Sequence, residues 1–351
     1  MLNEERWLPE ALAAMRAQET DGELEFLFAD GGSTDRTREI LDRTARADGR
    51  IRVLDNPRRV TPSGLNVALG QARGDYVARM DAHSFYPPDY LRRAVERLRR
   101  GDTRWVSGPV IPRPIGRVSR ALALALTTPL GHGGARKWAG EGTAEEVDLD
   151  TGVFGGVWRR ETVMAYGGWD EHWPQNQDAE LAGRFLGRGE RLVCLSAMGA
   201  QYVPRDTLRG LWRQYRNYGF YRVATARRHP HSMRRSHVLP PALVLTLAAA
   251  VVAPRRPRRL ARAGVGLYAA LLAREAGRAG RHGAGPGDAL TVPLVLAAMH
   301  LGNGVGVLRG VARFGLPGAA VARAAGLRGL ARKLAPPPAD VYAPSLGDRC
   351  A

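Results

Sequence analysis

Apolar and polar positions alternate in short blocks along the first half of the chain. Polar residues 3–5, with acids, precede apolar residues at helical spacing and predict a first helix. Short apolar runs at residues 23–29, 51–54 and 76–80 are typical of buried strands, and helical patterns lie at residues 36–47 and 61–72. This alternation predicts an α/β fold with a doubly wound, mostly parallel sheet.

The same alternation continues to residue 235. The pattern predicts helices at residues 87–100, 177–186 and 208–228, and strands at residues 105–111, 153–158 and 192–195. Gly155 and Gly156 lie inside one predicted strand, which indicates that another group approaches the backbone closely. The loop-rich stretch at residues 131–137 is expected to be a mobile lid. We expect residues 1–235 to form the first domain.

Three apolar stretches follow, at residues 238–253, 263–273 and 289–308. A membrane-spanning helix needs about 20 apolar residues, so only the third is long enough, and it contains Pro293 and His300. Arginines between residues 255 and 262 would keep both ends of the first stretch on the cytoplasmic side. We expect residues 236–310 to form a membrane-associated helical segment with a re-entrant or interfacial hairpin. An ordinary soluble helical domain is the alternative. Residues 311–351 are expected to be a basic amphipathic and disordered tail.

The excess of positive over negative charge lies in the second half of the chain. The net charge is +18, and residues 205–351 alone carry 24 Lys and Arg against 5 Asp and Glu. Such a cationic and apolar region indicates contact with anionic lipid. Nucleic acid is not an expected partner, because no zinc-finger or RRM pattern is present. Only Cys194 and Cys350 are available, which indicates a reducing compartment, and residues 1–18 carry charges where a secretory signal would be apolar.

Two acidic clusters are candidates for a ligand-binding or catalytic site. Asp81 and His83 follow a predicted strand, at the edge where open α/β sheets bind ligands, and Asp178 begins a predicted helix. A carboxylate and an imidazole two residues apart suit Mg²⁺ or Mn²⁺, which takes its other ligands from water and phosphate oxygens. The alternatives are a polar strand end for the first cluster and an acid stabilised by the helix dipole for Asp178.

These segments, in this order and spacing, resemble the family 2 glycosyltransferases with a GT-A fold, and among them the membrane-associated succinoglycan-biosynthesis type. The resemblance covers residues 2–235 and continues into the apolar region. It rests on these motifs: Leu2-Asn3-Glu4-Glu5, Asp30-Gly31-Gly32-Ser33-Thr34-Asp35, Gly64-Leu65-Asn66, Met80-Asp81-Ala82-His83, residues 155–160, Gly167-Gly168-Trp169-Asp170-Glu171, residues 176–181 and residues 213–219.

The resemblance implies an inverting, metal-dependent transfer of a sugar from a nucleotide donor, expected to be a UDP-sugar, to a lipid-linked saccharide at the cytoplasmic face of the membrane. Asp81 and His83 would hold Mn²⁺ or Mg²⁺, which neutralises the leaving diphosphate. Asp178 would take the proton from the acceptor hydroxyl, and Glu180 is expected to be structural. The remaining site residues implied are Asp30, Gly31, Ser33, Asp35, Asn66 and Asp81 for the nucleotide sugar, and Trp169, Gln214 and Arg216 for the acceptor or phosphate.

Three departures from the family pattern carry expectations. Gln177 stands where a Glu is common, which should lower the pKa of Asp178 relative to the family. Asn217 stands where an Arg is expected, so Arg216 would substitute for it, or this helix only covers the core. The family has a strand before Asn3, and a sheet without it would contain a slot. We therefore expect the native start upstream of Met1, which the preceding in-frame codons would test.

Two other functions stay open at this stage. The first is a catalytically inactive GT-A domain that serves as a membrane scaffold in polysaccharide assembly. The second is a basic nucleic-acid binder, which predicts salt-sensitive retention on DNA through the cationic region.

Overall fold

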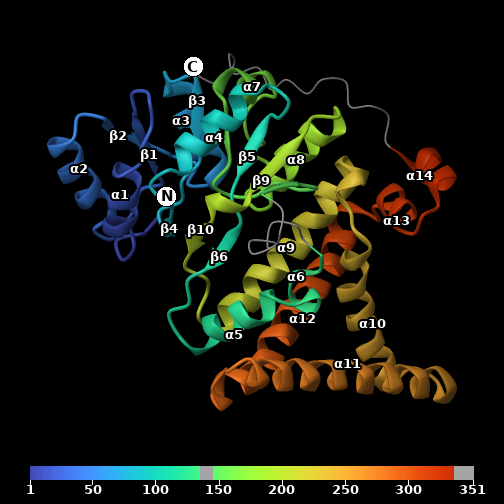
Figure 1. The fold of residues 1–351 in the computed structure, drawn as a ribbon. Coiled ribbons are helices and arrows are strands. Elements are labelled where there is room, and N and C mark those ends of the chain that lie inside the picture. The colour runs from blue at the N-terminus through green and yellow to red at the C-terminus, as the bar shows by residue number, and fades with distance from the viewer. Residues whose placement is uncertain (135–144, 336–351) are drawn as a thin grey trace. The chain divides into compact units, whose positions relative to one another are not determined.

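The computed structural model describes residues 1–134 and 145–335, and its contacts divide the chain into two compact units. The first unit contains residues 1–111 and the described residues 145–202. The second contains the described residues 112–134 and 203–335. Strands are concentrated in the first unit, whereas the second consists of helices (Figure 1).

The first unit has the predicted alternation of strands and helices. Its elements are α1 (Leu8–Arg16), β1 (Phe26–Asp30), α2 (Thr37–Ala47), β2 (Ile51–Asp55), α3 (Thr61–Gln71), β3 (Tyr76–Ala78), β4 (Ser84–Phe85), α4 (Tyr90–Arg99), β5 (Trp105–Ser107), β6 (Val110–Pro112), β7 (Glu146–Asp148), β8 (Val157–Arg159), α7 (Arg160–Ala165), α8 (Gln177–Gly187), β9 (Leu192–Leu195) and β10 (Ala200–Tyr202). One predicted strand is divided into β5 and β6 at Gly108 and Pro109. Another, β8, begins only after Gly155 and Gly156, whose backbone is approached by Tyr90 and by Trp105 and Trp158, respectively.

The strands form a parallel pair β1–β2, a five-stranded sheet in the order β3-β8-β5-β9-β7, and a three-stranded sheet β4-β10-β6. The α/β arrangement is as predicted, but the prediction of a mostly parallel sheet holds only for β1–β2 and β5–β9. The strand β8 is antiparallel to both of its neighbours, and β7 is antiparallel to β9. The apolar runs show where strands lie, but not whether neighbouring strands are parallel or antiparallel. That depends on how the strands are connected and paired.

A gap separates β1 from β3. Within the described part of the chain β1 pairs only with β2, and β3 pairs only with β8. The facing edges of both strands line a cavity of about 650 Å³, with Phe26 and Phe28 on one side and Tyr76 and Val77 on the other, and Met1 hydrogen-bonds to Ala29 and Gly31 at the end of β1. The slot predicted between sheet strands is therefore present, and the upstream start stays a prediction. The strand predicted at residues 76–80 is present as β3, but it ends at Ala78 and is half exposed instead of buried, because it borders this cavity.

Two apolar cores flank the gap. Leu8, Leu12, Ile40 and Leu41 pack α1 and α2 against β1 and β2. A second core packs α4 on the five-stranded sheet, through Tyr90, Leu91, Ala94, Leu98, Val106, Val157 and Val193. Leu24 and Met80 contact both cores and so connect the two halves of the first unit.

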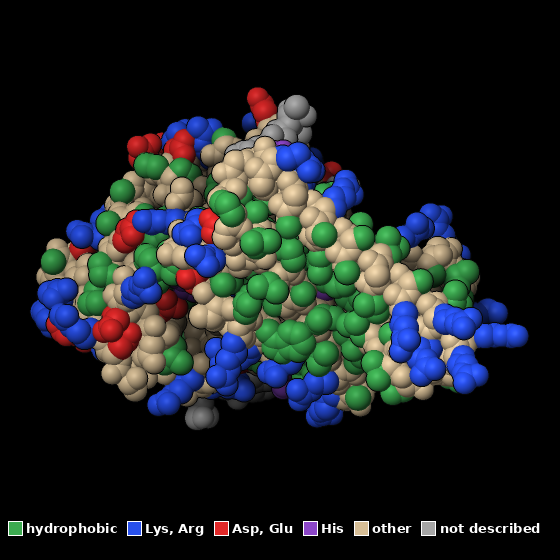
Figure 2. Space-filling view, turned by 90° about the horizontal axis from the view of Figure 1, so that it is seen from below, with side chains coloured by type: hydrophobic (Ala, Val, Ile, Leu, Met, Phe, Trp, Pro, Cys, Tyr) green, Lys and Arg blue, Asp and Glu red, His purple; other side chains and the backbone are tan. Residues whose placement is uncertain are grey.

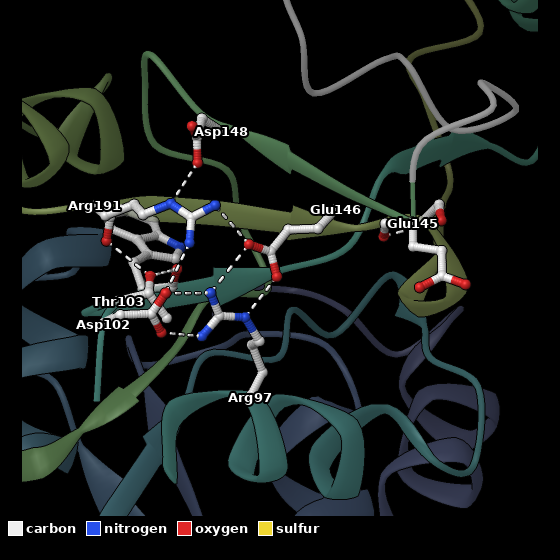
Figure 3. Close-up of polar contacts among 9 residues, drawn as sticks. Arg97, Asp102, Thr103, Glu145, Glu146, Asp148 and Arg191 are labelled. Carbon is white, nitrogen blue, oxygen red and sulfur yellow. Dashed lines mark hydrogen bonds and ion pairs between the residues drawn. The ribbon is translucent and has the colours of Figure 1, made fainter. Parts of the chain in front are cut away.

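An ion-pair network fastens α4 to the edge of the five-stranded sheet (Figure 3). The buried Arg97 of α4 donates to Glu146 of β7 at 2.5 Å and also pairs with Asp102. Arg191, next to β9, contacts Asp102 at 2.8 Å, Glu146 at 2.7 Å and Asp148 at 2.7 Å. The hydrogen bond from Arg97 lowers the pKa of Asp102 to about 2 and also lowers the pKa of Glu146. This network holds the edge strand β7 against α4.

The second unit is built around one long helix. Its elements are α5 (Arg117–Leu126), α6 (Pro129–His132), α9 (Leu208–Arg228), α10 (Leu239–Val252), α11 (Arg255–Arg281), α12 (Pro286–Phe314), α13 (Gly318–Ala324) and α14 (Arg328–Leu334). The helix α12 lies at the centre of an apolar cluster with α5 and α9, through Leu122, Leu126, Leu211, Val292, Leu296 and Met299. The predicted lid is described only to residue 134, where it includes α6, and the predicted tail only to residue 335.

Glycines allow α9 to lie against α12. A Cβ atom at Gly306 would come within 2.0 Å of the carbonyl oxygen of Arg216, and one at Gly219 within 2.2 Å of the carbonyl oxygen of Asn303. Only glycine permits this backbone contact. It explains why α9, which we expected to end the first domain, groups with the helical unit.

Candidate active site

The turn after β1 is folded back on Asp30. The Asp30 carboxylate is buried and accepts hydrogen bonds from the Ser33 backbone nitrogen at 3.2 Å and the Ser33 hydroxyl at 2.6 Å. Gly32, at φ 75°, permits this reversal. The Asp30 side chain therefore shapes the Gly31–Ser33 turn, and its predicted contact with a nucleotide base stays a prediction.

Two further contacts tie this turn to the residues before α1. The Ser33 hydroxyl accepts a hydrogen bond from the Asn3 backbone at 3.0 Å. Asp35 accepts one from the Glu5 backbone at 3.1 Å and one from the Thr37 backbone at 3.0 Å, next to the start of α2. The structure thus brings Asp30, Gly31, Ser33 and Asp35 together in one loop, as the sequence motif indicated.

Asp81 lies beyond the end of β3 and is held by Arg79. The Arg79 guanidinium donates to Asp81 Oδ1 at 2.8 Å and to Asp81 Oδ2 at 3.2 Å. The Asp81 backbone nitrogen donates to the hydroxyl of Tyr86 at 3.1 Å. Burial by itself would raise the pKa of Asp81, but the positive charges of Arg79 and His83 lower it below the usual value. Asp81 is therefore held as a carboxylate.

The same guanidinium also holds Asp178. Arg79 Nη1 donates to Asp178 Oδ1 at 2.6 Å and to Oδ2 at 2.8 Å. Asp178 lies in the first turn of α8, and the Arg79 side chain is only 8% exposed. The two predicted acids, far apart in sequence, therefore share one buried cation. Sequence reasoning did not select Arg79, although Arg79 and Asp81 are two residues apart and would share a face in an extended segment.

His83 contacts a residue that the prediction also missed. Its Nδ1 atom lies 3.1 Å from Glu4 Oε1. Glu4, Arg79, Asp81 and His83 all line the same cavity between β1 and β3. A signal for Glu4 was present, since it belongs to the first motif of the resemblance.

The donor atoms at this position fit a divalent ion with few protein ligands. Within the described residues, no group of three or more His, Cys, Asp or Glu side chains converges as a metal site. Asp81 and His83 nevertheless offer a carboxylate and an imidazole, which are partly exposed at 22% and 38%. Mg²⁺ and Mn²⁺ accept such small donor sets when phosphate and water supply the other ligands.

Asn66 and Trp169 meet in the structure. The Asn66 amide donates to the Trp169 carbonyl at 2.8 Å and to Glu171 at 3.0 Å, and its oxygen accepts from the Trp169 backbone at 2.9 Å. Trp169 is buried and packs edge-on against Trp158, with ring centroids 5.6 Å apart. Asn66 therefore anchors the loop that carries Trp169, and its predicted contact with the donor stays a prediction.

Glu180 is fully buried beside Arg184, which it contacts at 2.8 Å. Arg184 also donates to the carbonyl oxygens of Tyr166 and Gly168, the latter at 2.7 Å. These contacts connect α8 to the Gly167-Gly168 turn, which supports the structural role expected for Glu180.

Gln214 and Arg216 lie on α9 in the second unit. The Gln214 amide donates to the Tyr218 hydroxyl at 2.9 Å along the same helix. The predicted contact of these two residues with acceptor or phosphate stays a prediction.

The chain is similar to known proteins over much of its length. The family described as "Glycosyl transferase family 2" matches residues 1–146. The succinoglycan biosynthesis protein ExoA of Rhizobium meliloti is 33% identical over 237 residues, which cover 65% of this chain and 68% of that protein. The undecaprenyl-phosphate 4-deoxy-4-formamido-L-arabinose transferase of Pseudomonas aeruginosa is 35% identical over 103 residues, or 28% of this chain and 30% of that enzyme.

Among solved structures, a mannosyltransferase from Pyrobaculum calidifontis in complex with GDP-Man and Mn²⁺ has a similar fold. The TM-score is 0.54 at 19% sequence identity, and the alignment covers 86% of this chain and 84% of that one. The predicted GT-A-like fold is confirmed by this similarity.

Proposed function

Because the chain belongs to the family 2 glycosyltransferases, of the succinoglycan-biosynthesis type, we propose that it is an inverting, metal-dependent enzyme. It moves a sugar from a nucleotide-sugar donor, a UDP-sugar, to a lipid-linked saccharide. The observation that carries this proposal is the convergence of Asp81 and Asp178 on Arg79. This convergence supports a site in which Asp81 helps to hold the diphosphate and Asp178 activates the acceptor.

Asp81 and His83 would hold the divalent ion, Mn²⁺ or Mg²⁺. A bound divalent ion supplies positive charge that stabilises the nucleoside diphosphate as it leaves. Glu4 contacts the His83 ring at Nδ1 and so orients the Nε2 atom. The turn at Asp30 and Ser33 borders the same region and would receive the nucleoside.

Asp178 is the proposed general base. It removes the proton from the acceptor hydroxyl while that oxygen attacks the anomeric carbon, and a single displacement inverts the configuration there. Arg79 fixes the Asp178 carboxylate by two hydrogen bonds, so its position is set before substrates bind. We assign Arg79 a positioning role, because it contacts both acids and the reacting atoms would lie beyond them.

The acceptor is proposed to be a lipid-linked saccharide at the cytoplasmic face of the membrane, in the synthesis of an exported or cell-surface glycan. Two supports are the related transferase that acts on undecaprenyl phosphate and the long apolar helices of the second unit.

The test is donor turnover by the full chain. Nucleoside diphosphate release from a panel of nucleotide sugars is measured with and without Mn²⁺, in the native protein and in Asp81→Ala. Release that needs Mn²⁺ and falls by about a hundredfold or more in the variant supports the proposal. Absence of release with every donor, in a protein with a normal melting transition, would favour the catalytically inactive scaffold.

A further inference from the structure

The central helix of the second unit, α12, packs against other helices over part of its surface, while Leu290 and Leu294 on it are exposed. Its glycines contact α9 on one side, where a Cβ atom at Gly302 would lie 2.9 Å from the Trp212 carbonyl oxygen. A Cβ atom at Gly304 would lie 2.3 Å from the Pro240 carbonyl oxygen at the start of α10. His300 is hydrogen-bonded to Leu130 and Tyr268, each at 3.0 Å. The helix α12 therefore has the length and composition of a membrane-spanning helix, but one side of it packs against other helices of the protein.

The helix α9 that covers α12 could not itself lie in hydrocarbon. It carries arginines along its whole length, at positions 209, 213, 216, 222, 227 and 228. A charged side chain at the centre of a bilayer is strongly unfavourable. A transmembrane placement of α12 would take α9 with it, so the pair belongs outside the membrane core.

The helix α10 is exposed but short. It has 14 residues, and with the 3-10 turn Arg235–Val238 before it the helical run has 18 residues, which span about 27 Å against about 30 Å for the hydrocarbon core. Only Pro241 of this helix is buried. At its end Val251 and Val252 are 72% and 80% exposed, directly before α11 begins.

The helix α11 presents an apolar stripe to solvent. Leu260, Ala263, Leu267 and Ala270 are exposed and lie at helical spacing on one face. Leu260 and Leu267 are 76% and 64% exposed. Within the second unit α11 lies across the direction of α12 (Figure 1). Seen from below, the molecule shows a broad area of hydrophobic side chains bordered by Lys and Arg (Figure 2).

The charge of α11 is almost entirely positive. It contains eight arginines and one acid, Glu275, and that acid is buried and paired with Arg278 at 2.9 Å. Arg255, Arg256, Arg259 and Arg262 are exposed at the end of the helix next to Val251 and Val252. Apolar side chains bordered by arginines complement a bilayer surface of anionic lipids, because the long arginine side chains reach the headgroups while the apolar stripe enters the acyl region.

We propose that α11, with the end of α10, lies in the plane of an anionic membrane and inserts into one leaflet only. The α11 stripe, defined as Leu260, Ala263, Leu267 and Ala270, enters the bilayer, and no helix of the described chain crosses it. This inference adds the manner of membrane binding to the proposed function. It is measured without turnover, so a failure of sugar transfer would leave it intact.

The first test is flotation of the full chain with vesicles of equal parts phosphatidylglycerol and phosphatidylcholine, or of phosphatidylcholine alone. We expect binding to the anionic vesicles, and at least about tenfold weaker partition for the double variant Leu260→Glu/Leu267→Glu. Replacing Arg255, Arg256, Arg259 and Arg262 by Gln should also weaken binding about tenfold or more. The control with the same charge change replaces Arg6, Arg43, Arg46 and Arg100, which are exposed in the first unit. Met164→Glu, on α7, controls for an added acid at an exposed apolar site.

The second test separates insertion into one leaflet from crossing. Single cysteines replace Val238 and Arg255, at the two ends of α10, in a Cys350→Ser background, and vesicle-bound protein is treated with an impermeant maleimide from outside. Labelling of both positions supports the proposal, and protection of one of them overturns it in favour of a spanning α10. The proposal also fails if the protein does not float, or if the stripe variants lose only a lipid-independent self-association seen by light scattering.

Discussion

Arg79 holds the carboxylate of Asp178 with hydrogen bonds of 2.6 and 2.8 Å across 99 residues of sequence. The other side of the same guanidinium holds Asp81. Three charges thus lie in one partly buried cluster, in which Arg79 positions both acids and its charge lowers the pKa of Asp81. Removing the Arg79 guanidinium would affect both proposed functions of the site, metal binding and base catalysis.

Replacing Arg79 by Met should lower the free energy of unfolding by about 3 kcal/mol, since two partly buried carboxylates lose their partner. Compared with the native protein, the Arg79→Met variant should lose a larger share of its donor turnover at low pH than at high pH. The reason is that the pKa of Asp81 is lowered by Arg79 and would rise without it. The measurement is a pH profile of nucleoside diphosphate release together with thermal unfolding. Arg79→Lys retains the charge and should recover part of both; a variant profile that keeps its shape would contradict the positioning role.

Replacing Asp178 by Asn should reduce transfer to an acceptor by about a thousandfold, because the amide cannot take a proton. The fold and the donor-induced rise in melting temperature should persist. Glu161→Gln is the matched control, because Glu161 is an exposed acid in the first turn of another helix, α7. If both variants lost only a few tenths of a kcal/mol of stability and no activity, Asp178 would merely be an acid at a helix N-terminus.

Arg97→Met should destabilise the protein by about 2 kcal/mol at neutral pH, since the ion-pair network of α4 and β7 loses its buried member. The pKa values of Glu146 and Asp102 are lowered in the folded state, that of Asp102 to about 2. Groups with a lowered pKa contribute stability above their unfolded pKa of about 4, and this contribution is lost as pH falls through the folded value.

The difference between native protein and Arg97→Met should therefore be full above about pH 5 and shrink towards about pH 2. Urea unfolding at several pH values measures it. Arg36→Met, which removes the exposed pair with Glu39, should leave stability essentially unchanged at every pH. A constant difference for Arg97→Met across that range would mean that packing, and not charge, accounts for its effect.

Gly306→Ala should destabilise the second unit by about 1–3 kcal/mol, because the new Cβ atom would overlap the backbone of α9. Gly266→Ala is the control within a helix of the same unit, as nothing lies within 4 Å of its Cβ position. That change should be neutral or stabilise by up to about 1 kcal/mol. Thermal unfolding of both variants decides the matter, and equal effects would exclude a close α9–α12 contact.

Much of the fold was readable from local pattern. The strands β1, β2 and β9 and the helices α2, α3, α8 and α9 lie within one to three residues of their predicted ends, since hydrophobic period and capping are local properties. Strand direction was not readable, and the predicted parallel sheet proved to be mixed. Direction depends on which edges meet, and that is a property of the whole chain.

The sequence alone determined the order of elements, the two acids at Asp81 and Asp178, and the confinement of positive charge to the second half. Tertiary structure alone decided that Arg79 joins those acids, that a cavity separates β1 from β3, and that α12 packs one side against α5 and α9 while the stripe of α11 is exposed. The physical reason is that periodicity fixes which face of a segment is apolar. What covers that face, or which charge lies beside an acid, is fixed only when segments distant in sequence pack together.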